Sequence, residues 1–241
     1  MLNLESLREF TNKWQTSIQN VVRVYIQHLF LAHLYKLDHA EKLLFKGGTA
    51  LRIIYQSPRF SEDLDFTGCN IGQVREIDEL FIETLAAMEK MGIPISFQDA
   101  KATTGGYLGI IVYTLFGIAE RMKFEISLRR SKTVAETTTI INEYTPPYTL
   151  TGLSAGEIVQ GKMDALINRR KPRDYYDLYF FLRHPRLRKY VDTKRLSIIL
   201  TNLEKEKVNF KIALAPFLPK SHQMILRDFK AMLQKEIETY R

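Results

Sequence analysis

In the stretch Leu43-Leu-Phe-Lys-Gly-Gly-Thr-Ala-Leu51, three apolar residues lead to two adjacent glycines, and apolar residues at helical spacing then continue to Tyr55. An apolar run that meets a Gly-Gly pair and gives way to helical spacing predicts a strand, a tight turn and a helix. The segment Asp63-Leu-Asp-Phe66 alternates polar with apolar residues, which is typical of a half-buried strand. The sequence therefore predicts a glycine turn that precedes a strand bearing two aspartates.

The glycine turn is a candidate phosphate site. Without side chains, Gly47 and Gly48 allow backbone N–H groups to approach an anion closely, and the start of the following helix adds a favourable dipole. Lys46 offers a positive charge and Thr49 a hydroxyl for a triphosphate. The alternative is an ordinary tight turn that needs positive φ. The spacing matches neither the Walker A motif nor the dinucleotide-binding fingerprint.

The two aspartates are candidate metal ligands. Asp63 and Asp65 are two residues apart, so on a strand both carboxylates point to one face while Leu64 and Phe66 point to the core. Paired hard oxygen ligands favour Mg²⁺, which binds through one or two carboxylates plus substrate phosphates. The alternative is a strand edge that exposes alternating acids for solubility.

The remaining patterns outline two regions. We predict helices over 4–37 and 73–91 and strands over 93–97, 107–116 and 122–128, and we predict no strand after Pro146-Pro147. Ser154 and Glu157 form a capping-box signature for a helix to about Arg169, and a second helix is expected to begin near Arg173.

These expectations define an α+β fold with a mixed, twisted sheet flanked by helices and a mostly helical C-terminal region. The expected division is 1–148 and 149–241.

Bulk composition narrows the class of protein. The chain has 241 residues and one cysteine, Cys69, and its first apolar positions are interrupted by charges, so we expect a cytoplasmic protein with neither a disulfide nor a membrane span. Residues 1–120 hold 11 Lys and Arg against 14 Asp and Glu, whereas 121–241 hold 24 against 13. A basic half suggests a phosphate-rich partner such as nucleic acid, or only a solvated surface. The five histidines show no metal-ligand spacing.

The order of strand, Gly-Gly, helix and Asp-x-Asp resembles the signature of the DNA polymerase beta-like nucleotidyltransferases. More narrowly, Phe45-Lys-Gly-Gly-Thr-Ala-Leu51 and Arg59-Phe-Ser-Glu-Asp-Leu-Asp-Phe66 resemble the AbiEii family of abortive-infection and toxin–antitoxin nucleotidyltransferases. The resemblance implies a nucleotidyltransferase core in which Arg59 and Ser61 join the glycine turn in binding the nucleotide. It also implies a third carboxylate from a neighbouring strand. Glu125 has the right parity, although it could instead be a surface glutamate paired with Lys123.

A second motif extends the resemblance to about residue 180. Lys162-Met-Asp-Ala-Leu-Ile-Asn-Arg169 precedes Arg173-Asp-Tyr-Tyr-Asp177, as in the family's lysine-bearing helix and the Arg-Asp-x-x-Asp start of its next helix. The resemblance implies that Lys162 contacts the triphosphate and that Asp174 or Asp177 is a required acid. The spacing also fits a salt bridge in which a cation on one helix faces the acids of the next.

A basic cluster followed by Tyr175 and Tyr176 could contact an RNA backbone or stack on an exposed end, or could only neutralise the acidic site. The cluster consists of Arg169, Arg170, Lys171 and Arg173.

The function that these features imply is transfer of a nucleoside monophosphate from an NTP to an acceptor hydroxyl, with two Mg²⁺ (or Mn²⁺) ions at the reacting phosphate. The resemblance and the basic half favour the tRNA 3′ end as acceptor, in a growth-inhibiting, phage-defence toxin that is restrained by a cognate antitoxin protein. The alternatives are transfer to a protein or a small molecule, and a nucleotide- or RNA-binding module without catalysis.

Overall fold

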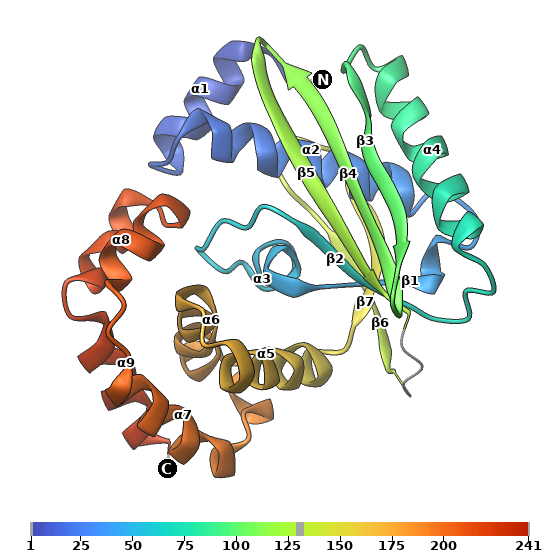
Figure 1. The fold of residues 1–241 in the computed structure, drawn as a ribbon. Helices are drawn as coiled ribbons and strands as arrows, with labels where there is room; N and C mark the ends of the chain where they lie inside the picture. The colour runs from blue at the N-terminus through green and yellow to red at the C-terminus, as the bar shows by residue number, and fades with distance from the viewer. Residues whose placement is uncertain (1, 129–132, 241) are drawn as a thin grey trace. The chain divides into compact units, whose positions relative to one another are not determined.

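The computed structural model describes residues 2–128 and 133–240, and the chain divides into two compact units, traced in Figure 1. The sheet unit consists of Met1–Gln56 and Phe60–Leu153. The helical unit consists of Ser57–Arg59 and Ser154–Arg241. Three residues, Ser57–Arg59, therefore belong to the helical unit although the chain on both sides of them belongs to the sheet unit.

Seven strands among the described residues form one sheet in the order β3-β4-β5-β2-β1-β7-β6. Their bounds are β1 Leu43–Lys46, β2 Leu64–Gly68, β3 Ile95–Thr103, β4 Gly106–Leu115, β5 Ile118–Ser127, β6 Ala135–Ile140 and β7 Tyr148–Leu153. Strand β2 runs antiparallel to β1 and parallel to β5, so the expected mixed sheet is confirmed.

Helices α2 and α4 cover the apolar face of this sheet (Figure 1). Four helices belong to the described part of the sheet unit: α1 Leu4–Lys13, α2 Ile18–Leu34, α3 Gly47–Tyr55 and α4 Val74–Lys90. Phe30 of α2 and Phe81 of α4 both meet Phe124 of β5, with ring centroids 4.6 and 4.9 Å apart. Burial of these rings removes much apolar surface from water and fixes which face of β2 and β5 points inward.

The helical unit is built from α5 Ala155–Arg169, α6 Pro172–Arg183, α7 Thr193–Lys205, α8 Phe210–Leu214 and α9 Phe229–Thr239, with short 3-10 turns between them. The expected start of α5 is confirmed, because the Ser154 side chain accepts a hydrogen bond from the backbone N–H of Glu157. Pro172 occupies the first turn of α6, where its missing N–H costs no helical bond. None of the helices among the described residues is long and apolar enough to span a bilayer.

Two strands, β6 and β7, were not predicted from the sequence, and β7 corrects the expectation that strands end before Pro146-Pro147. Strand β7 contains Tyr148 and two threonines, which favour strands, but it is six residues long, contains Gly152 and directly follows the two prolines. It forms because β1 and β6 flank it on both sides. The sheet unit consequently ends at Leu153, beyond the expected boundary at residue 148.

Candidate functional site

The glycine turn joins β1 directly to α3, as the sequence predicted. Gly47 has φ +83°, and a Cβ atom at this position would lie 2.0 Å from Oδ2 of Asp65. The Asp65 carboxylate therefore lies against the backbone at the first turn of α3, an approach that only glycine permits. Lys46, the last residue of β1, stands opposite Asp65 in the antiparallel register of β1 and β2.

The predicted carboxylates lie on two neighbouring parallel strands. Asp65 is the register partner of Glu125, and Leu64 is the partner of Phe124. Because Phe124 is buried against α2 and α4, Asp65 and Glu125 share the opposite face. Asp63 immediately precedes β2, and its side chain is 30% exposed. The expected parity of Glu125 is thus confirmed.

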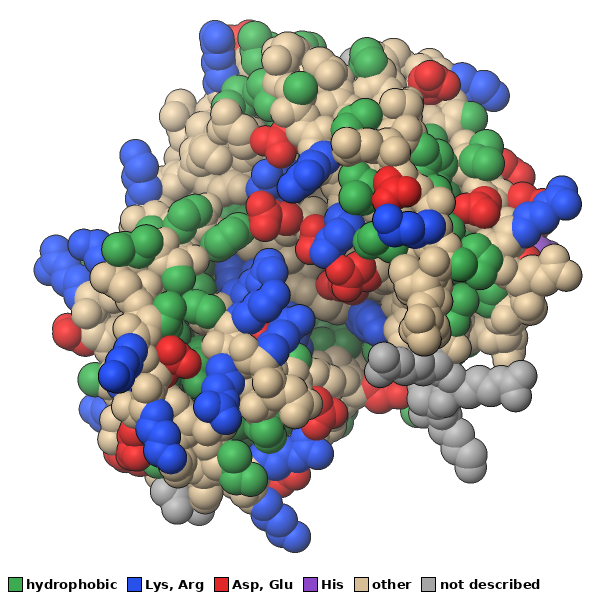
Figure 2. Space-filling model, in the orientation of Figure 1, with side chains coloured by type: hydrophobic (Ala, Val, Ile, Leu, Met, Phe, Trp, Pro, Cys, Tyr) green, Lys and Arg blue, Asp and Glu red, His purple; other side chains and the backbone are tan. Residues whose placement is uncertain are grey.

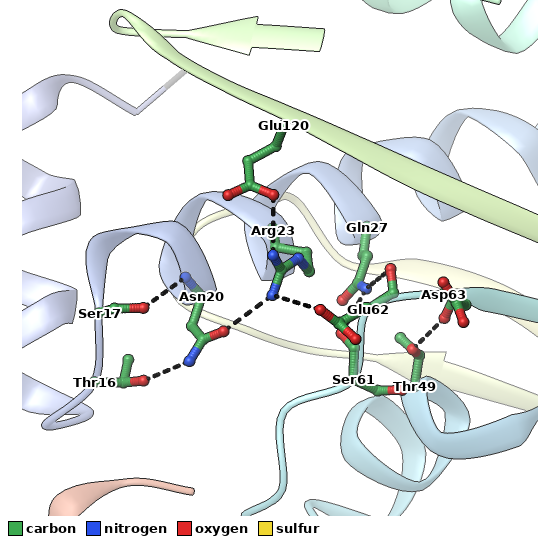
Figure 3. Close-up of polar contacts among 10 residues, drawn as sticks. All are labelled: Thr16, Ser17, Asn20, Arg23, Gln27, Thr49, Ser61, Glu62, Asp63 and Glu120. Atoms are coloured by element: carbon green, nitrogen blue, oxygen red, sulfur yellow. Dashed lines mark hydrogen bonds and ion pairs between the residues drawn. The ribbon is translucent and has the colours of Figure 1, made fainter. Parts of the chain in front are cut away.

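The backbone that leads into Asp63 is held by two buried side chains (Figure 3). The Thr49 hydroxyl donates to the carbonyl oxygen of Asp63. Gln27 of α2 donates from Nε2 to the carbonyl oxygens of Ser61 and Glu62, at 3.0 and 3.3 Å. Thr49 was expected to bind a phosphate, but its hydroxyl proton is directed to this backbone carbonyl. Ser61 is itself buried.

Arg23, one turn before Gln27 on α2, adds an ionic contact to the same segment (Figure 3). Its guanidinium lies 4.0 Å from Glu62 and 2.9 Å from Glu120, and it donates to Asn20. Sequence analysis did not single out Arg23 or Gln27. A signal was available, since polar side chains four residues apart on an otherwise apolar helix need buried partners.

Lys123 lies between two of the predicted metal ligands. Its Nζ is 2.5 Å from Oε1 of Glu125 and 3.6 Å from Oδ2 of Asp63. Burial opposes the charged form of Lys123, but its bond to Glu125 and the charge of Asp63 outweigh burial and raise its pKa. Within the described residues no three His, Cys, Asp or Glu side chains are grouped closely enough to hold a metal ion. Asp63 and Asp65 still offer the two hard oxygen ligands that suit Mg²⁺.

The helical unit contains a buried network of ion pairs. Lys162 of α5 lies 2.8 Å from Asp177 and 3.7 Å from Asp174, both on α6. Asp177 also accepts two bonds from Arg59, at 2.8 and 3.0 Å, and Arg169 pairs with Asp174 at 2.8 Å. The predicted salt bridge between the two helices is therefore confirmed.

The network keeps Asp177 ionised although its side chain is buried. Burial alone would raise the pKa of Asp177, but the Arg59 and Lys162 cations hold the pKa below its usual value. Arg59 is also buried, and its guanidinium forms an ion pair with Asp177. Each charge is compensated by an opposite charge, as a buried ion pair requires.

The idea that Tyr175 and Tyr176 stack on an exposed RNA end is wrong. Both rings are buried within the helical unit, where Tyr175 packs edge-on against Phe210 and Tyr176 stacks on Phe229. They belong to the second turn of α6, whose other side chains are mostly buried. Arg170 and Lys171 differ, because these two residues lie between α5 and α6 and are exposed.

Comparison with known proteins supplies the context for this geometry. A family model described as nucleotidyl transferase AbiEii toxin, type IV toxin–antitoxin system, matches residues 29–239. MenT4, a nucleotidyltransferase toxin of Mycobacterium tuberculosis, has the same fold with a TM-score of 0.67 at 17% identity, over 100% of this chain and 90% of MenT4. JHP933 of Helicobacter pylori has a TM-score of 0.66 at 20% identity, over 93% of each chain. No curated protein matches in sequence.

Proposed function

The chain belongs to the AbiEii family of nucleotidyltransferase toxins, and on that basis we propose that it transfers a nucleoside monophosphate from an NTP to an acceptor hydroxyl and releases pyrophosphate. The observation that carries the proposal is the contact between the Asp65 carboxylate and the Gly47 backbone. This contact brings the acid that we propose as a metal ligand to the first turn of a helix, where backbone N–H groups favour phosphate.

In the proposed site, each group has a role that follows from its chemistry. Asp63 and Asp65 would hold Mg²⁺ or Mn²⁺, which neutralises charge on the reacting phosphate and its leaving group. The N–H groups of Gly47 and Gly48 would bind the triphosphate, and the ammonium of Lys46 would add a charge beside it. Thr49 would act through Asp63, because its hydroxyl holds the Asp63 carbonyl.

The second motif contributes Lys162 to the proposed site. On the family resemblance, we propose that Lys162 contacts the triphosphate. Asp174 and Asp177 would then act through Lys162, since they lie 3.7 and 2.8 Å from its Nζ and can hold the ammonium in one place. Arg59 would orient Asp177 in turn.

We further propose that the acceptor is the 3′ end of tRNA. Of the 35 Lys and Arg and the 27 Asp and Glu, the helical unit holds 20 and 10, which leaves 15 and 17 to the sheet unit. An excess of cations in one unit favours a polyanionic substrate. A modified tRNA 3′ end would stop translation, and a cognate antitoxin would restrain the protein.

The test is incubation of the purified protein with α-labelled NTPs and Mg²⁺ together with tRNA, a protein extract or an aminoglycoside, each in a separate reaction. We expect label on the tRNA 3′ end and loss of labelling with Asp63→Asn or Asp65→Asn. Label confined to protein or to the aminoglycoside would overturn the tRNA proposal. Growth inhibition that survives both substitutions would overturn the catalytic proposal in favour of a binding module.

A further inference from the structure

Lys123 of β5 was not assigned a role in catalysis, yet its position is fixed by the strands that carry the carboxylates. The parallel register pairs Leu64 with Phe124 and Asp65 with Glu125. Asp63 and Lys123 each stand one residue before the first of these pairs, and their side chains contact one another. Because side chains alternate along a strand, Lys123 and Glu125 project from the same face as Asp65.

The ammonium of Lys123 contacts two acids that are separate in sequence. Its Nζ lies 3.6 Å from Oδ2 of Asp63 and 2.5 Å from Oε1 of Glu125. A divalent ion bound to those oxygens would have to lie about 2.1 Å from each of them. The ammonium and such an ion cannot share the same oxygens at these distances, and their positive charges repel.

The side chain can leave this position. Lys123 is 37% exposed and Glu125 is 54% exposed, so both face solvent in part. A lysine ammonium is a strongly hydrated point charge on a flexible four-carbon stem, and it can move into water at small cost.

We propose that Lys123 is an internal cation that competes with the divalent metal for Asp63 and Glu125. In the absence of nucleotide, Lys123 occupies these acids and keeps metal affinity low. A triphosphate brings negative charge that favours the metal, so metal and nucleotide enter together. The inference rests on the proposed function, because it assumes that Asp63 binds the metal.

The experiment is a titration with Mn²⁺, followed by the electron paramagnetic resonance of the free ion, for wild-type protein without nucleotide and for four variants. Removal of a neighbouring positive charge should tighten Mn²⁺ binding at least about tenfold in Lys123→Met. Lys123→Arg keeps the charge and should bind like the wild type. Arg121→Met removes a charge two residues earlier on the same strand and should change the Kd little. Lys123→Gln is a second uncharged variant and carries the same expectation as Lys123→Met.

A non-hydrolysable NTP analogue should reduce the difference in Mn²⁺ affinity between the wild type and Lys123→Met, because the triphosphate compensates for the lysine charge. Equal Mn²⁺ affinity in Lys123→Met, Lys123→Gln and Arg121→Met would overturn the inference about Lys123. That result leaves the proposed function intact if Asp63→Asn still weakens Mn²⁺ binding. Absence of Mn²⁺ binding to the wild type, with or without the analogue, would instead count against the proposed function.

Discussion

At the scale of single residues, Thr49 determines where Asp63 stands. Thr49→Val keeps the shape of the side chain and removes the bond to the Asp63 carbonyl. We expect the unfolding free energy to fall by about 1–3 kcal/mol, because a buried carbonyl loses its donor. Nucleotidyl transfer should fall roughly 10–100-fold, since a small displacement of a reacting group is costly. Urea denaturation and a labelled-NTP assay measure the two effects, and Thr49→Ser, which retains the hydroxyl, should restore most of both.

His28 gives the sheet unit a dependence on pH. Its ring is buried between Tyr144 and Tyr148, 2.9 and 2.8 Å from their hydroxyls, and burial lowers its pKa from 6.5 to about 3, with a smaller contribution from Arg52. The unfolded chain therefore takes up this proton first as pH falls. The contribution of neutral His28 to the unfolding free energy is fully present above about pH 6.5. Below that pH it falls by up to ~1.4 kcal/mol per pH unit.

Urea denaturation at pH 7.5, 6.0 and 5.0 checks this expectation. His28→Gln carries no titrating group, so its unfolding free energy should change less over the same range. Parallel pH profiles for the two proteins would show that His28 does not titrate as its surroundings indicate.

The acids of the site were predictable from sequence because strand alternation assigns Asp63 and Asp65 to one face before any partner is known. The contacts of Gln27, Thr49 and Lys123 were not. Each depends on a segment brought close by the fold, such as α2 against residues 61 and 62, and no local spacing encodes that proximity.

At the scale of elements, the turn between β1 and α3 tolerates no side chain. Gly47→Ala adds a Cβ that would overlap the Asp65 carboxylate, and it also forces alanine to φ +83°. Gly92 has nearly the same φ, +82°, but nothing lies within 4 Å of an added Cβ. We expect Gly92→Ala to cost about 1–2 kcal/mol of stability with activity intact. Gly47→Ala should cost more and abolish measurable transfer, and equal activity of the two variants would contradict this account.

The pairing of α5 with α6 depends on Asp177. Asp177→Asn leaves Arg59 and Lys162 without its charge, and we expect a loss of about 3–5 kcal/mol in unfolding free energy. Asp164 of α5 pairs with Arg195 but is 58% exposed, so Asp164→Asn should change stability by less than ~1 kcal/mol. Thermal denaturation of both variants separates a structural contribution of Asp177 from a purely catalytic one.

Helix boundaries near α5 and α6 followed from Ser154 and Pro172, whose effects act within one turn. Strand β7 did not follow from local sequence. Its pairing with β1 joins residues about a hundred positions apart, Phe45 and Gly152, and local spacing does not encode such a long-range partner.

At the scale of the whole molecule, the excess of positive charge lies in the helical unit, and Figure 2 shows Lys and Arg side chains interspersed with Asp and Glu on the visible surface. If RNA phosphates bind at residues 170–173, where the chain enters α6, the combined change Arg170→Gln, Lys171→Gln and Arg173→Gln should weaken tRNA binding. The slope of log affinity against log salt should become shallower by up to ~3, since each lost phosphate contact contributes about 0.9.

The matched control removes the same charge elsewhere in the helical unit, with Lys205→Gln, Lys207→Gln and Lys211→Gln. Filter binding to tRNA at several salt concentrations compares the two variants. Equal slopes would show that the unit binds RNA through diffuse charge and that residues 170–173 have no special part in it.

The brief excursion of the chain into the helical unit at Ser57–Arg59 has a consequence for evolution. A gene cut or recombined at Ser154 would separate Arg59 from Asp177, its buried partner. Neither unit can be exchanged as a contiguous cassette without this loss. Lineages should therefore inherit the two units together, and substitutions at Arg59 and Asp177 should occur as a pair.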